Sequence, residues 1–191
     1  MVQLKGSETE KKLLAAFAGE SQARNRYTYF ASVARKEGYE QIAALFLETA
    51  DNEKEHAKRF FRLLEGGDVE IQASYPAGFI GNTVQNLKAA ADGELLEWGT
   101  LYQDAAEIAR KEGFEHVSRQ FEEIAQVEKQ HEARYRKLLK NIEKGEVFQK
   151  NEKVLWQCRN CGYVVESLNA PQKCPACEHP QAYFQLKANN Y

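Results

Sequence analysis

Two copies of the pattern Glu-x-x-His, formed by Glu53 with His56 and by Glu128 with His131, combine residue types that bind metals. Residues three positions apart on a helix share one face, so each pair presents a carboxylate beside an imidazole. Both pairs stand where the apolar periodicity of their segment calls for core residues. An uncompensated carboxylate in a core costs on the order of several kcal/mol. A single pair is usually solvated, but this recurrence on two apolar stripes predicts bound metal cations.

Three further carboxylates extend the pattern to two other helical segments. Glu20 and Glu94 interrupt apolar stripes of their own. With a rise of about 1.5 Å per residue, antiparallel packing brings Glu20 within about 5 Å of the level of Glu53. By the same measure, Glu97 lies closer than Glu94 to the level of Glu128. One Glu from each of two helices and one Glu-x-x-His from each of two others is the ligand set of carboxylate-bridged di-metal bundles, and Glu97 is an additional candidate ligand. Such oxygen-rich coordination favours iron or manganese, although zinc also binds it.

An internal repeat relates the two halves of the helical region. The number of positions from Glu53 to Glu128 is the same as from His56 to His131, and this offset relates the two halves. The offset from Glu20 to Glu94 is one residue shorter. The second half therefore carries one extra residue inside a continuing helix. A π-bulge accommodates such a residue most cheaply, and π-bulges favour functional sites. We predict one near residues 97–101.

Other polar side chains lie close to the predicted metal layer. Tyr27 and Tyr102 recur at matched positions of the two halves, on or beside the apolar stripes. They are either ordinary core aromatics or phenols that hydrogen-bond ligand carboxylates, as the surroundings of metal ligands require. Together with Glu97, they are the candidate catalytic proton donors. Glu48 and Glu132 fall off the stripes and are expected to be solvated.

All four cysteines form two Cys-x-x-Cys pairs, Cys158 with Cys161 and Cys174 with Cys177. This spacing predicts one tetrahedral metal bound by four thiolates. Iron and zinc both fit that geometry, so the pattern alone leaves open an iron centre and a structural zinc ribbon.

The elements that hold these residues are predicted to be four long helices, because the first two-thirds of the chain has helix-forming composition. Glycines and cap residues bound them. A long connection over residues 68–82 between two short turns is the connectivity of ferritin-like bundles. We therefore predict a mainly α fold, a ferritin-like four-helix bundle over residues 1–146 with a long crossover, followed by a small β and knuckle domain over residues 147–191. The expected helices run from a cap near Ser7 or Thr9 to residue 36, and over 39–64, 83–110 and 114–143.

Composition limits the partners and compartments. The chain has 191 residues and a formal net charge of −2 without a basic stripe, which argues against nucleic-acid binding. No apolar run reaches the length of a membrane span, and residues 1–8 lack the apolar segment of a signal peptide. We expect a cytoplasmic protein whose cysteines stay reduced, which favours metal binding over disulfides.

The Glu-x-x-His pairs, the stripe carboxylates and the run Cys158-x-x-Cys161-Gly162-Tyr163 resemble the rubrerythrin family over essentially the whole chain. The resemblance implies a non-haem di-iron centre in the bundle and a rubredoxin-like single-iron centre at the C-terminus. It also implies a cytoplasmic homodimer in anaerobic or microaerophilic microbes. Since residues 145–153 form a short tether, a head-to-tail exchanged dimer is expected to bring the two centres together.

The resemblance also implies roles for individual residues. Glu53 and Glu128 would bridge the two irons, and Glu20 and Glu94 would be terminal ligands. His131 would hold one iron, whereas the other iron would exchange His56 for Glu97 with redox state. One departure is Glu178, which stands where rubredoxin-like knuckles usually have glycine and bears on the hydrogen bonding of the neighbouring sulfur.

The function implied by the resemblance is a peroxidase that reduces hydrogen peroxide to water. A reduced di-iron pair would supply two electrons and two Lewis-acid sites, and the four-cysteine iron would refill it with single electrons. External electrons would come from an NAD(P)H-dependent reductase or from rubredoxin. One alternative is a ferroxidase or oxidase that uses dioxygen for iron detoxification. Another is a non-catalytic protein with a zinc ribbon, which leaves the Glu and His layer unexplained.

Overall fold

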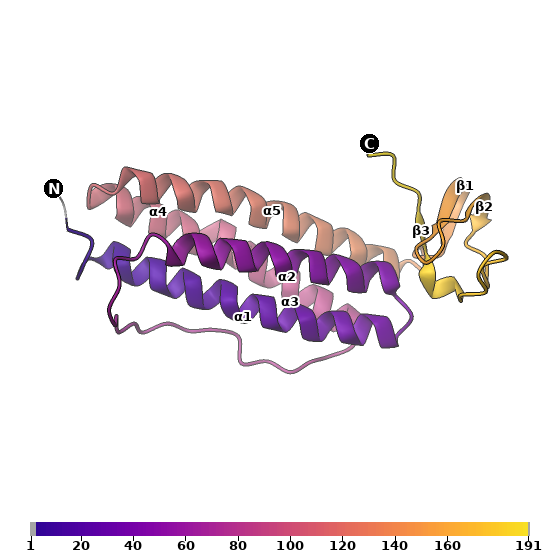
Figure 1. Ribbon diagram of the computed structural model, residues 1–191, viewed down its shortest axis with the longest axis horizontal. Coiled ribbons are helices and arrows are strands. Elements are labelled where there is room, and N and C mark those ends of the chain that lie inside the picture. The colour runs from indigo at the N-terminus through magenta and orange to yellow at the C-terminus, as the bar shows by residue number, and fades with distance from the viewer. Residues whose placement is uncertain (1–2, 191) are drawn as a thin grey trace.

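The computed structural model describes residues 3–190 and consists of a long helical bundle with a small sheet at one end (Figure 1). The connectivity is two helical hairpins joined by a long crossover, so the predicted ferritin-like bundle is confirmed. None of the helices among residues 3–190 is long and apolar enough to cross a membrane. The helices are α1 (Glu8–Lys36), α2 (Glu40–Phe61), α3 (Thr83–Leu96), α4 (Tyr102–Lys111) and α5 (Glu115–Glu143).

Local chemistry accounts for the helix ends. Ser7 caps α1 by accepting a hydrogen bond from the Glu10 N–H, and the Glu10 carboxylate accepts one from the Gly6 N–H at 2.7 Å. Helix α2 ends at Phe61, earlier than predicted, because its last turn tightens: the Leu63 N–H bonds the Phe60 carbonyl at 3.1 Å. Hydrogen bonds of this 3₁₀ type, between residues three positions apart, are common where a helix ends.

The predicted π-bulge is confirmed at the predicted residues. The segment η1 (Glu97–Leu101) is a π-helical turn between α3 and α4. This turn accommodates the extra residue of the second half, so α3, η1 and α4 form one continuous helical rod. Glu97 is the first residue of this turn.

The bundle core is divided by a polar layer. One apolar cluster includes Tyr27, Phe46 and Tyr135, and the other includes Phe60 and Tyr102. Between these clusters in sequence, each long helical rod contributes buried carboxylates instead of apolar side chains. The core packing therefore positions the polar layer and shields it from water along the bundle axis.

A three-stranded antiparallel sheet in the order β2-β1-β3 follows the bundle. Its buried core includes Trp156, Phe184 and two of the cysteines. The sheet lies beyond the turn between α1 and α2 (Figure 1), where Tyr39 stacks on Phe148 with ring centroids 6.2 Å apart. The strands are β1 (Gln149–Cys158), β2 (Val164–Asn169) and β3 (Phe184–Leu186).

Candidate metal centre

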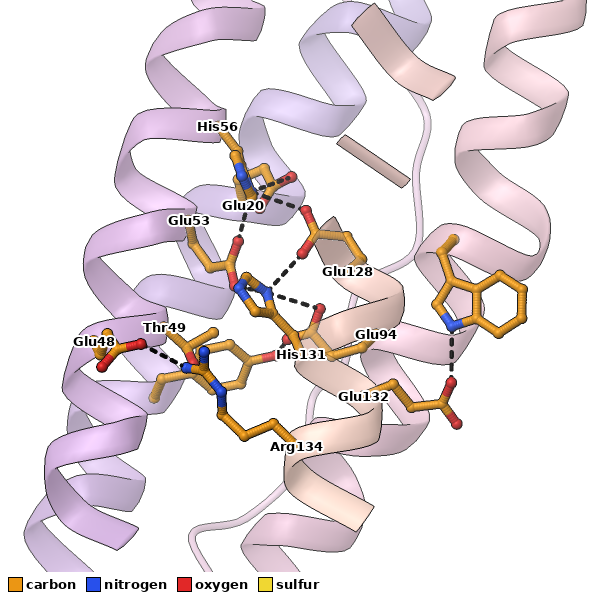
Figure 2. A network of polar contacts seen from close by, with 12 residues as sticks. Glu20, Glu48, Thr49, Glu53, His56, Glu94, Glu128, His131, Glu132 and Arg134 are labelled. Atoms are coloured by element: carbon orange, nitrogen blue, oxygen red, sulfur yellow. Dashed lines mark hydrogen bonds and ion pairs between the residues drawn. The ribbon is translucent and has the colours of Figure 1, made fainter. Parts of the chain in front are cut away.

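Six predicted ligands converge in the polar layer of the bundle (Figure 2). Their donor atoms form two groups, and within each group the donors lie within 4.8 Å of one another. The groups share two carboxylates, so the arrangement is that of two adjacent metal positions bridged by common ligands. One group is Glu20, Glu53, His56 and Glu128, and the other is Glu53, Glu94, Glu128 and His131.

The imidazoles define the centre of each group. His56 Nδ1 lies 2.9 Å from Glu53 Oε2 and 2.8 Å from Glu128 Oε1. His131 Nδ1 lies 2.8 Å from Glu128 Oε2 and 3.1 Å from Glu53 Oε1. Each of the two shared carboxylates therefore directs one oxygen to His56 and the other oxygen to His131, as a bridging ligand does.

The layer leaves buried polar atoms without partners. Several donor atoms are buried and lack a hydrogen bond of satisfactory geometry among residues 3–190: one oxygen each of Glu20, Glu53 and Glu94, both oxygens of Glu128, and Nδ1 of His131. Buried polar groups normally find partners, and unsatisfied ones point to a missing ion or water. Cations between these atoms would satisfy them together, so the residues fit a di-iron site.

The charges of the layer support the same conclusion. Burial and the nearby Glu53 charge together raise the pKa of Glu94 to about 8. Burial opposes ionisation of Glu53 as well, but the nearby imidazoles of His131 and His56 lower its pKa to about 2. Burial disfavours the His131 cation, yet the close carboxylates of Glu128, Glu53 and Glu94 raise its pKa to about 12. Without metal, protons retained on these side chains offset the negative charge of the layer. Metal cations would displace these protons.

The two tyrosines bind carboxylates across the bundle. Tyr27 on α1 donates its hydroxyl hydrogen to Glu94 on α3, and Tyr102 on α4 donates to Glu20 on α1. Burial and the facing carboxylate charge raise the pKa of both phenols well above the usual value, so both stay protonated donors. Both phenols therefore hydrogen-bond carboxylates of the two donor groups, and the role of those carboxylates as metal ligands stays a prediction.

Glu97 lies beside the layer but belongs to neither donor group. A Cβ atom on Gly19 would lie 3.9 Å from its Oε1 atom, so the carboxylate faces α1. Burial raises its pKa well above the usual value, and the charge of Glu94 adds to the rise. Its role as a metal ligand stays a prediction.

Of two carboxylates predicted to be solvated, Glu48 is exposed as expected, whereas Glu132 is largely shielded. Glu132 accepts a hydrogen bond from the Trp98 indole at 2.8 Å, which ties α5 to the π segment, and Glu48 pairs with Arg134 at 2.9 Å (Figure 2). Sequence periodicity misses the shielding of Glu132 because it reports only the bundle-facing stripe. The only available signal for Glu132 was its position next to His131.

The four cysteines form a separate compact group. The sulfur of Cys158 lies 3.7 Å from that of Cys177, and the sulfur of Cys161 lies 3.6 Å from that of Cys174. Four sulfurs at about 2.3 Å from a tetrahedral metal lie about 3.8 Å apart. The group therefore fits a single tetrahedral iron or zinc.

Glu178 takes over the backbone geometry of the expected glycine. Its φ is 62°, close to the 80° of Gly162 in the first knuckle. The Glu178 N–H bonds the Cys174 carbonyl at 2.9 Å, and the Gly162 N–H bonds the Cys158 carbonyl at the same distance. The departure in sequence thus leaves the turn intact. A backbone hydrogen bond from His179 lowers the pKa of the Cys177 thiol to about 6, which favours the metal-binding thiolate.

Comparison with known proteins agrees with both sites. A model of the rubrerythrin family matches residues 11–139, and a model of the rubrerythrin rubredoxin-like domain matches residues 156–185. The chain is 62% identical to a rubrerythrin of Porphyromonas gingivalis over 98% of this chain and 94% of that protein. It is 53% identical to a rubrerythrin of Nitratidesulfovibrio vulgaris over the full length of both. A solved nigerythrin in a fully reduced, all-ferrous state has a TM-score of 0.63 and 30% identity, covering 97% of this chain and 92% of that one.

Proposed function

We propose that this chain, which belongs to the rubrerythrin family, is a di-iron peroxidase that reduces hydrogen peroxide to water and protects an anaerobe against oxidative stress. The family and the fold support an oxidoreductase with a di-iron site and a four-cysteine iron site. The single observation that carries the proposal is the pair of donor groups sharing Glu53 and Glu128. We also propose that residues 1–146 and 147–191 are separate domains.

We assign ligand roles from the donor groups. Glu53 and Glu128 would bridge the metals because each contributes to both groups, and Glu20 and Glu94 would each complete one group. The structure has His56 in the same kind of contacts as His131, which supports a state with one imidazole on each metal. Exchange of His56 for Glu97 would need movement of the π segment that carries Glu97.

When bound, the reduced iron pair supplies two electrons and two Lewis-acid positions for an O–O unit. The chain supplies the protons and the geometry. Glu97, with its raised pKa, holds a proton on the α1 side of the layer and is the candidate acid for the peroxide oxygens. Tyr27 and Tyr102 position Glu94 and Glu20 through their hydroxyl hydrogens. The apolar clusters above and below exclude water.

The four-cysteine centre is proposed to pass electrons singly to the di-iron pair. Within one chain the sheet contacts the start of α2, and the helix from Tyr39 to Glu53 alone spans about 21 Å. Electron transfer slows steeply with distance, so this separation supports a head-to-tail homodimer in which one chain's cysteine centre serves its partner. Rubredoxin or an NAD(P)H-dependent reductase would supply external electrons in the cytoplasm.

The test is a comparison of two oxidants. The iron-loaded protein is reduced without air and mixed with hydrogen peroxide or dioxygen in parallel stopped-flow runs, while the return of the ferric–thiolate colour is followed. Much faster return with peroxide is the expected result. Equal or faster return with dioxygen would indicate an oxidase or ferroxidase, and no return with either would contradict electron transfer from the cysteine centre.

A further inference from the structure

A cavity of about 460 Å³ leads from the surface to the side of the metal layer. It lies between α1, the crossover and the π segment, and Figure 1 shows the crossover running alongside the bundle here. Tyr75 of the crossover fixes this wall, because its hydroxyl donates to the Ala15 carbonyl at 2.7 Å. Glu97 and Tyr102 form part of the inner end. The apolar lining includes Ala15, Ala16, Ile71, Pro76, Leu96 and Leu101.

The cavity is far larger than hydrogen peroxide requires. A water molecule takes about 30 Å³ in the liquid, and hydrogen peroxide, with one more oxygen atom, is only slightly larger. Cavities of about 300–1,000 Å³ with mostly apolar walls and a few polar groups are typical of small organic ligands. The volume and lining therefore fit a substrate with an apolar group attached to the reacting oxygens.

Two glycines inside helices keep this space open. Gly19 of α1 and Gly93 of α3 both line the cavity, and each immediately precedes a carboxylate of the metal layer. Glycine inside a helix costs roughly 0.5–1 kcal/mol relative to alanine, so its presence needs a reason. A Cβ on Gly19 would meet the Tyr75 ring at 3.7 Å and Glu97 at 3.9 Å. An alanine would fit there, but a larger side chain would extend into the cavity.

The polar end of the cavity contains an unused hydrogen-bond donor. Arg26 lines the cavity, and its buried Nε atom has no hydrogen-bond partner within the described part of the chain, residues 3–190. Its Nη2 atom would lie 3.6 Å from a Cβ on Gly93. Buried donors without partners are rare in proteins and indicate a missing group. An oxygen of a bound hydroperoxide, or of its alcohol product, would accept this hydrogen bond.

We propose that this cavity binds alkyl hydroperoxides with a compact apolar group and that Gly19 determines this specificity. The inference rests on the proposed peroxidase function and widens its substrate class. Reduction would break the O–O bond and give one alcohol and one water. The iron pair of the proposed function supplies the two electrons, Glu97 supplies one proton and solvent supplies the other.

Binding is tested first, without any turnover. The full chain is loaded with zinc, which is redox-inert, and titrated with 2-phenyl-2-propanol, the alcohol product of cumene hydroperoxide. We expect saturable NMR shifts of the Gly19 and Gly93 amides, retained in Gly19→Ala and lost in Gly19→Leu. Arg24→Leu, on an exposed position of the same helix, is the matched control and should bind as the unchanged chain does. Absence of saturable shifts in the unchanged chain would overturn the proposal.

Turnover then separates this inference from the proposed function. The iron-loaded chain should reduce both hydrogen peroxide and cumene hydroperoxide. Gly19→Leu should lower kcat/KM for cumene hydroperoxide at least about tenfold more than for hydrogen peroxide, mainly through KM, as expected for a filled pocket. Reduction of hydrogen peroxide alone would refute the cavity's role and leave the peroxidase intact. Failure with both oxidants would refute the peroxidase, and the alcohol titration would still decide whether the cavity binds its ligand.

Discussion

The crossed hydrogen bonds of the two tyrosines predict that each phenol supports the metal position of the opposite half. Tyr27 donates to Glu94, which belongs to the donor group of His131, whereas Tyr102 donates to Glu20, which belongs to the group of His56. Tyr27→Phe should therefore weaken metal binding in the group of His131, and Tyr102→Phe should weaken it in the group of His56.

The magnitude follows from the hydrogen bond that each substitution removes. A hydrogen bond to a charged group contributes about 1.5–3 kcal/mol, and losing one beside a metal ligand costs about 10–100-fold in affinity. The ring itself stays in place, because Tyr27 packs on Phe46 and Tyr135 with centroids 6.1 Å and 5.5 Å away. The effect should therefore appear as a local loss of affinity rather than as unfolding.

The assay must resolve the two positions. Crystals of the zinc-loaded variants, equilibrated with graded chelator, give the occupancy of each position from anomalous scattering. Tyr135→Phe is the control, since its buried hydroxyl has no satisfactory hydrogen-bond partner among residues 3–190, and it should leave both occupancies unchanged. Loss at the same position in both tyrosine variants, or equal loss at both positions, would refute the crossed arrangement.

Further predictions concern protons, electrons and the π segment. The metal-free protein should lose stability between about pH 5 and pH 9: the folded state keeps a proton on Glu94 up to about pH 8 and on His56 up to about pH 9, whereas the unfolded chain releases them near 4.5 and 6.5. The melting temperature of the metal-free protein should fall as the pH rises over this range, and metal loading should make it less dependent on pH. A melting temperature of the metal-free protein that rises with pH would contradict the charge assignment. Cys161→Ser should abolish the red ferric–thiolate colour but leave the reduced di-iron pair able to react once with peroxide in a single-turnover mix. Loss of that turnover as well would exclude a pure relay role for the cysteine centre. Glu97→Ala should retain both irons by metal analysis and slow peroxide reduction at least about 10²-fold, the usual contribution of a general acid; iron loss would instead make Glu97 an essential ligand.

Much of the metal layer was predictable because helical periodicity is simple. The Glu-x-x-His spacing, the rise per residue and the two glycine turns fix which carboxylates reach one level. The extra residue of the second half even located the π segment, since a continuous helix has few other ways to absorb it. These inferences depend only on distance along the chain.

Features that depend on contacts between helices were not predictable in the same way. The sequence does not specify that Tyr27 reaches Glu94 rather than Glu20, because that choice depends on which helices face each other across the bundle. The bond from Trp98 to Glu132 and the cavity beside Gly19 arise from side-chain directions outside the apolar stripes. The turn at Glu178 could not be predicted either, because a left-handed backbone conformation is unusual for a residue other than glycine.

The π segment gives the two halves of a duplicated scaffold different chemistry. The ligands otherwise correspond pairwise between the halves, so the two metal positions would be near equivalents related by an approximate twofold axis. The inserted residue is contained within one turn, and Tyr102 returns to the position that matches Tyr27. Glu97 therefore becomes an acidic group on one side only, with Ala23 or Gln22 at the corresponding place in the first half. A single insertion would thus make one metal position distinct from the other while preserving the pairing of every other predicted ligand.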